Sequence, residues 1–218
     1  MNRLDSGTDS IVWMKKEYFI RTCRLLQVLV FYVSILRRKQ MEKQKTVKLA
    51  KMSLLVAISI ILVYLIHFPI FPAVAFLEYD PADIPILIGT FAFGPVAGVI
   101  LTVVTSVIQG VTVSAASGVY GIIMHIIATS VFVIVAGLIY KAKKTKKSAV
   151  FALACGAASM VTVMIGANMV ITPLFMGVPA AAVWDLMPFI ALFNLIKAWV
   201  NAIFTFIIYK RVSGFLHK

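Results

Sequence analysis

The sequence predicts an all-α integral membrane protein with six transmembrane helices and a long loop between the first two. Hydrophobic residues make up 61% of its 218 residues and charged residues only 13%, whereas soluble domains carry about 25% charged residues. Six apolar segments follow one another between residues 48 and 209, and most basic residues cluster outside them. This arrangement is typical of a multi-pass membrane protein.

Residues 1–40 do not follow this pattern. Tyr18–Leu36 is apolar, but two arginines interrupt it, and an arginine at the membrane centre costs about 2.5–3.5 kcal/mol. The segment has no small-residue cleavage site, which argues against a signal peptide, and a basic helix at the membrane surface is one alternative. We favour another interpretation, in which 1–40 is an extension upstream of a native start at Met41, and 41–218 is the six-helix membrane domain.

Lys48–Ile66 is the first predicted span. The small residues Ala50, Ser53 and Ala57 recur along it at helical spacing and therefore lie on one side of the helix. Small residues allow two membrane helices to approach closely. Two interpretations stay open, namely packing of this side within the protein and docking to another membrane subunit.

The stretch Phe76–Pro95, FLEYDPADIPILIGTFAFGP, begins acidic and becomes apolar. Pro81 and Pro85 are tolerated in a first helical turn, and a Gly-Pro pair ends the stretch, so a helix over Ala82–Phe93 is predicted. This helix is shorter than the about 20 residues of an upright span. We interpret the segment before it as a loop that covers a ligand, with the acidic residues Glu78, Asp80 and Asp83.

Four longer apolar segments complete the six predicted spans. Each is close to the about 20 residues that a membrane crossing requires, and small, basic or proline-containing connections separate them. The spans are Val96–Val113, Val119–Tyr140, Ser148–Met169 and Phe189–Tyr209, with connections at Ser114–Gly118, Lys141–Lys147 and Thr172–Met187.

The basic residues set the predicted orientation. Twelve of the 21 Lys and Arg residues lie in Met1–Lys51, five lie in Lys141–Lys147, and none lies between His67 and Tyr140. With six spans, both termini and the basic loop fall on one side, which the positive-inside rule makes cytoplasmic. Because the charges mark topology rather than a basic binding face, no nucleic-acid partner is expected.

One charged residue, Lys197, lies well inside the predicted spans, on one helical stripe with Asn194 and Asn201. An ionisable residue inside a membrane helix indicates a functional site; a structural ion pair, or a lysine that reaches the membrane surface, is the alternative. Asn168, near the outer end of the preceding span, can share a cavity with this stripe. Amides both donate and accept, which suits a flat heterocycle with carbonyls and ring nitrogens.

Aromatic and apolar residues near the outer side are candidates for the walls of the ligand cavity, because small-ligand sites are mostly apolar. Packing at the lipid interface is the alternative for each aromatic residue. These candidates are Phe76, Leu77, Tyr79 and Tyr120.

No catalytic group is predicted. His125 has no acid or nucleophile at a workable spacing, and the acids do not pair across a span as a general acid and base would. Cys23 and Cys155 lie far apart without metal-ligand spacing. The sequence therefore predicts neither an enzyme nor a metal site.

The run Glu78–Pro85 (EYDPADIP), followed by GPVAG at Gly94–Gly98, resembles the riboflavin branch of the S components, the substrate-binding subunits of energy-coupling factor (ECF) vitamin importers. The resemblance covers about Lys45 to Lys210. It implies a protein of the bacterial cell membrane that binds riboflavin, or FMN, as a transported ligand rather than a cofactor. It further implies association with a membrane coupling subunit and two ATPase subunits.

The resemblance also assigns residues. Ser53 and Ala57 stand where the family has its AxxxA coupling face, with Ala50 about one turn earlier. Five residues are implied to hold the vitamin, namely Leu77, Glu78, Asn168, Asn194 and Lys197. Together with the loop and wall candidates, the predicted ligand-binding set is Leu77, Glu78, Tyr79, Asp83, Tyr120, Asn168, Asn194 and Lys197.

Other functions stay open at this point. One alternative is an S component for another vitamin or for a metal, although a metal S component should show clustered histidines near its start, which Met41 onward lacks. The other is a stand-alone secondary transporter or a membrane enzyme. The absence of a convincing internal repeat argues against an inverted-repeat transporter.

Overall fold

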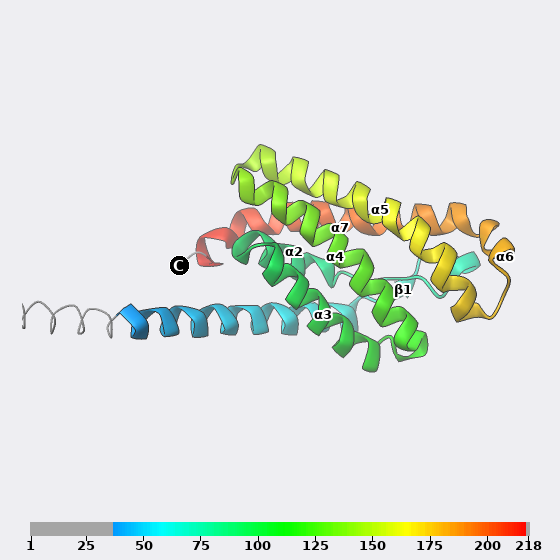
Figure 1. Cartoon of the computed structure of the whole chain (residues 1–218), viewed down its shortest axis with the longest axis horizontal. Helices are drawn as coiled ribbons and strands as arrows, with labels where there is room; N and C mark the ends of the chain where they lie inside the picture. The colour runs from blue at the N-terminus through cyan, green and yellow to red at the C-terminus, as the bar shows by residue number, and fades with distance from the viewer. Residues whose placement is uncertain (1–36, 217–218) are drawn as a thin grey trace, which may run out of the picture. The chain divides into compact units, whose positions relative to one another are not determined.

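The computed structural model describes residues 37–216 and the side chains of residues 37–211 (Figure 1). Contacts divide the chain into two units, Met1–Leu49 and Ala50–Lys218. In the first unit, residues 37–49 are helical and exposed. The rest of the predicted extension, 1–36, lies outside the described residues.

Four of the described helices are long and apolar enough to cross a membrane, and two apolar helices are shorter. The first long helix is Arg37–Leu65. The two shorter helices and the remaining long ones follow in chain order as α2 (Asp83–Phe93), α3 (Pro95–Val111), α4 (Gly118–Ala142), α5 (Lys146–Met176) and α7 (Met187–Leu216). Helix α4 packs against α3 and α5, α5 also packs against α7, and α2 contacts α3, α4 and α7.

Helix α2 is short but central. It begins after Pro81 with Asp83 in its first turn, and it ends at Gly94, whose φ of 95° favours glycine. Its residues from Asp83 to Phe91 are all buried, although 11 residues span only about 16 Å. Packing on all sides by longer helices therefore stabilises a helix that is too short to cross a bilayer upright.

Close approach of α2 and α3 depends on Gly98. A Cβ atom at this position would overlap Thr90 Oγ1 and lie within 3.1 Å of Val133 Cβ. The Thr90 hydroxyl has little freedom to move, since it donates to the Ile86 carbonyl oxygen at 2.8 Å. The hydrophobic core around this contact joins Leu87 of α2 to side chains of the neighbouring helices.

The outer part of α5 differs from the prediction. The sequence placed the end of this span at Met169 and a loop at Thr172–Met187, which was wrong, because α5 continues to Met176 and a short helix, α6 (Ala180–Trp184), follows. Proline removes a single intrahelical hydrogen bond, and a packed membrane helix tolerates that loss. The helix continues past Pro173 and ends one turn later at Gly177, which has a left-handed φ of 66°.

Loop 66–82, between the first long helix and α2, contains a small antiparallel pairing of β1 (Phe68–Pro69) with β2 (Glu78–Tyr79). A 3-10 turn at Pro72–Val74 lies between them. Val74 is fully buried in a small hydrophobic cluster with Val183 and with Ile190 of α7. The cluster attaches the middle of the loop to the start of α7.

Candidate functional site: a cavity between loop 66–82 and four helices

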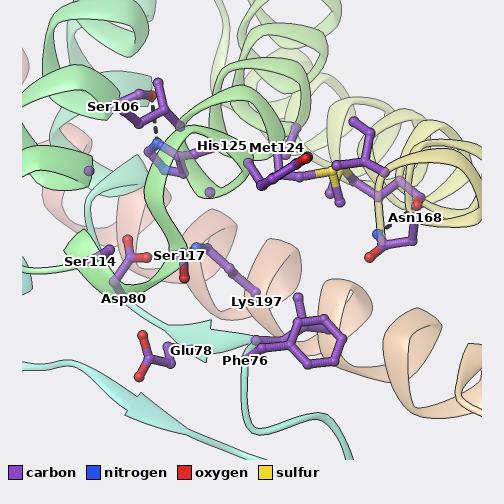
Figure 2. Close-up of a pocket in the computed structure, with 18 of the residues that line it drawn as sticks. Phe76, Glu78, Asp80, Ser106, Ser114, Ser117, Met124, His125, Asn168 and Lys197 are labelled. Atoms are coloured by element: carbon purple, nitrogen blue, oxygen red, sulfur yellow. Dashed lines mark hydrogen bonds and ion pairs between the residues drawn. The ribbon is translucent and has the colours of Figure 1, made fainter. Parts of the chain in front are cut away.

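A cavity lies between loop 66–82 and helices α3, α4, α5 and α7 (Figure 2). It encloses about 880 Å³ of space unfilled by atoms, a figure that includes the part open to solvent. Its polar and charged lining residues are His67, Glu78, Asp80, Ser106, Gln109, Ser114, Ser117, His125, Asn168, Thr172, Asn194 and Lys197.

The pair of Asp80 and Lys197 is the electrostatic centre of the cavity. Lys197 Nζ lies 2.8 Å from Asp80 Oδ2, and the two residues are only 7% and 3% exposed. Burial by itself would raise the pKa of the Asp80 carboxyl, but the charge of Lys197 and its hydrogen bond, together with the effect of His125, lower the pKa below its ordinary value. Asp80 therefore stays ionised, and Lys197 presents a compensated charge to the cavity.

Asp80 is also a structural junction. Its Oδ1 accepts from the Ala82 backbone N–H at 3.1 Å, at the start of α2. Its Oδ2 accepts from Gln109 Nε2 of α3 at 3.2 Å, and Asn201 Nδ2 of α7 donates to its backbone oxygen at 3.4 Å. One residue of loop 66–82 thus joins α2, α3 and α7.

A second buried carboxylate, Asp83, lies behind the cavity wall. It accepts from Thr129 Oγ1 of α4 at 2.6 Å and from Asn201 Nδ2 at 3.0 Å. His125 Nε2 lies 3.4 Å away without hydrogen-bond alignment. Asn201 Oδ1 in turn accepts from the Tyr79 hydroxyl at 3.1 Å.

Two amides of the cavity are fixed by their own helices. Asn168 Nδ2 of α5 donates to the Met164 carbonyl oxygen and Asn194 Nδ2 of α7 to the Ile190 carbonyl oxygen, each at 2.8 Å. Both residues are at least 97% buried and line the cavity. Because the helix holds one N–H of each amide, the remaining polar atoms have a defined direction.

Aromatic rings gather in the same part of the cavity as Asn168. Phe175 of α5 lies with its ring centroid 5.9 Å from Phe76 and 5.8 Å from Tyr120. All three rings line the cavity, together with Met160 and Met164. These side chains offer an apolar surface on which a flat group can pack.

One part of the cavity lining brings together two residues of loop 66–82 and one residue of the connection between α3 and α4. His67 Nε2 lies 2.9 Å from Glu78 Oε2 and 3.3 Å from Ser114 Oγ. All three line the cavity.

The structure places six of the eight predicted ligand-binding residues in the cavity lining, namely Leu77, Glu78, Tyr120, Asn168, Asn194 and Lys197. Tyr79 and Asp83 do not line it; they belong to the Asn201 network. The small residues Ala50, Ser53 and Ala57 are all exposed on the first long helix, whereas Met52, Leu55 and Ser59 are buried.

Several cavity residues were not among the predicted site residues, namely Asp80, Ser106, Gln109, Ser114, Ser117 and His125. The sequence contained a pattern that could have identified the two cavity residues on α3, Ser106 and Gln109. Thr102, Thr105, Ser106 and Gln109 recur at spacings of three and four, as do the polar residues of α7, and such a polar stripe indicates an inward-facing side.

A family model described as "ECF transporter, substrate-specific component" matches residues 47–209. The chain belongs to this family. Its members are transporter components rather than a class of enzymes, and the apolar helices agree with a multi-pass membrane protein.

Curated relatives of this S component include two riboflavin transporters. Riboflavin transporter RibU of Staphylococcus aureus (strain TCH60) is 30% identical over 192 residues, which cover 83% of this chain and 98% of the relative. Riboflavin transporter FmnP of Bacillus subtilis (strain 168) is 30% identical over 122 residues, covering 55% and 63%. A solved structure of the S component of a bacterial ECF transporter matches with a TM-score of 0.69 and 29% identity, over 80% of this chain and 99% of the other.

Proposed function

We propose that this S component binds riboflavin, or FMN, and mediates its uptake together with a membrane coupling subunit and two ATPase subunits. The observation that carries the proposal is the cavity beneath loop 66–82, whose lining includes Asn168, Asn194 and Lys197, in a chain related to riboflavin transporters over most of its length. The protein acts as a binding subunit rather than an enzyme, and riboflavin is its cargo rather than a cofactor.

The cavity chemistry suits the flavin ring. The ring system is flat and carries carbonyl groups and ring nitrogens along one edge, which the amides of Asn168 and Asn194 match as donors and acceptors. The aromatic and methionine side chains match its faces. Lys197 supplies a cation to a carbonyl oxygen, and its pairing with Asp80 keeps the ammonium in place before a ligand arrives.

The proposal includes a topology. Six spans, with α2 and α3 as the shorter second and third, place both termini and Lys141–Lys147 in the cytoplasm by the positive-inside rule. Loop 66–82 then faces outside and covers the ligand, with Leu77 and Glu78 against it. Residues 1–40 are an extension ahead of a native start at Met41, which a mass measurement on the native protein tests.

The direct test is the absorption spectrum of the purified protein, followed by titration of riboflavin fluorescence. The expected result is either co-purified flavin absorbance or stoichiometric quenching of added riboflavin, because aromatic side chains that stack on the flavin ring quench its emission. A colourless protein that leaves riboflavin fluorescence unchanged would contradict the proposal. Titration with FMN then decides whether the phosphate ester is also bound.

The side defined by Ala50, Ser53 and Ala57 is proposed to dock to the coupling subunit, supported by its exposure. We expect Ser53→Leu to leave riboflavin binding unchanged and to abolish ATP-driven uptake in the complete transporter, because the larger side chain prevents close helix approach. Ser53→Ala, which keeps the side small, should retain uptake. Normal uptake by the leucine variant would exclude this side as the interface.

A further inference from the structure

Hydrogen bonds around His125 of α4 determine that its Nδ1 carries a proton. Ser106 Oγ of α3 lies 2.7 Å from the Thr102 carbonyl oxygen and 2.7 Å from His125 Nδ1, and Figure 2 shows the second of these contacts. A hydroxyl has one hydrogen to donate, and a carbonyl oxygen can only accept. The Ser106 hydrogen therefore goes to Thr102, and Nδ1 donates its own hydrogen to Ser106 Oγ.

The other ring nitrogen of His125 faces a carboxylate. Nε2 is buried, has no hydrogen bond within the described part of the chain, and lies 3.4 Å from Asp83 Oδ1. With Nδ1 protonated, a neutral imidazole would turn the lone pair of Nε2 toward this oxygen, whereas an imidazolium turns an N–H toward it. Imidazole is more basic than a carboxylate, so a proton between the two groups belongs to the ring.

The buried charges beside the cavity also require a second cation. Asp80 and Asp83 are only 3% and 0% exposed, and Lys197, which pairs with Asp80 at 2.8 Å, compensates one of the two carboxylates. An uncompensated buried charge is strongly unfavourable. Riboflavin is uncharged, so the proposed ligand does not supply the missing positive charge, whereas an imidazolium at His125 does.

The other titratable side chains of this region do not supply that cation. His67 and Glu78 of loop 66–82 face each other at 2.9 Å, and the Tyr79 hydroxyl is a hydrogen-bond donor. Tyr120 is the other titratable residue that α4 contributes to the described lining, to which α3 and α5 contribute neutral residues. His125 is therefore the group placed to balance Asp83.

We propose that His125 holds a proton on both ring nitrogens at neutral pH and is the positioning residue for Asp83. The imidazolium contacts Ser106 of α3 and the first turn of α2, so one cation joins α2, α3 and α4. Asp83 in turn accepts from Asn201 Nδ2, which leaves Asn201 Oδ1 to accept from Tyr79 of loop 66–82. This charge state does not depend on which ligand occupies the cavity.

Nitrogen NMR of ligand-free, full-length protein labelled with [15N]histidine tests the charge state directly. The chain has three histidines, and the spectrum of His125→Gln identifies the ring of interest by subtraction; if that variant does not fold, His67→Gln and His217→Gln identify the same ring by elimination. At about pH 7 we expect both nitrogens of His125 to carry hydrogens. A bare ring nitrogen would overturn the proposal.

The variant Asp83→Asn tests whether the carboxylate is the reason for the second proton. It removes one buried negative charge at nearly constant shape, so we expect the His125 ring to become neutral and to keep its hydrogen on Nδ1, bonded to Ser106. An imidazolium that persists in this variant would overturn the role of Asp83. Failure of the unaltered protein to bind riboflavin would instead overturn the proposed function and leave the charge state of His125 unchanged.

The proton also makes stability depend on pH. The folded protein holds a proton that the unfolded chain releases above about pH 6.5, so raising the pH favours unfolding. Between about pH 6 and 9, we expect the melting temperature of the unaltered protein to fall more steeply than that of His125→Gln, whose amide carries no charge. His67→Gln is the matched control and should keep the steep fall; equal slopes in the unaltered protein and His125→Gln would overturn the positioning role.

Discussion

Replacing Lys197 with methionine is expected to raise the Kd of riboflavin by about 10- to 100-fold, as loss of a charged hydrogen bond does, and to destabilise the protein. The variant leaves the Asp80 carboxylate buried, at 3% exposed, without its ammonium. Removing one partner of a buried ion pair costs about 3–5 kcal/mol. Fluorescence titration measures the first effect and thermal melting in detergent the second.

Two further variants separate the effect of Lys197 on ligand affinity from its effect on stability. Lys210→Met, on an exposed lysine of the same helix, should change neither quantity. The double variant Lys197→Met with Asp80→Asn should recover much of the melting temperature, since it removes both charges of the buried pair, but not the affinity. Recovered affinity in the double variant, or a Kd within twofold in the single one, would show that the ammonium does not contact the ligand.

Replacing Asp83 with alanine is expected to cause a large loss of stability. Its carboxylate receives hydrogen bonds from Thr129 of α4 and Asn201 of α7, and each buried donor left unpaired costs about 1–3 kcal/mol. The melting temperature should fall strongly. Because Asp83 does not line the cavity, saturating riboflavin should still raise the melting temperature of the folded variant.

Asp185→Ala is the matched control, since Asp185 is exposed. It should melt at the temperature of the unaltered protein. A variant at Asp83 that melts normally but no longer responds to riboflavin would assign Asp83 to the ligand, as the sequence analysis expected, instead of to the α2–α4–α7 contact.

Local chemistry was sufficient to predict α2. Pro81, Pro85 and the pair Gly94–Pro95 fix where its backbone can begin and end, and the structure has Asp83–Phe93 where Ala82–Phe93 was expected. The same rule failed at Pro173, because proline weakens a helix without always ending it. There, packing against neighbouring helices decided the boundary.

The polar contacts of the site were harder to predict. A buried lysine on α7 was evident from the sequence, but its partner Asp80 lies 117 positions away, and nothing local selects Asp80 over Glu78 or Asp83. From the sequence alone, a structural ion pair and a functional site were alternatives for Lys197. The structure has an ion pair that itself lines the cavity, so the two descriptions are compatible.

The attachment of loop 66–82 to α7 affects how fast a molecule can exchange between the cavity and the medium. Tyr79 bonds to Asn201, Asp80 pairs with Lys197, and Val74 packs among residues at the start of α7. Lifting the loop breaks these contacts together, so a molecule whose exchange requires the loop to open leaves the cavity more slowly than diffusion alone would allow.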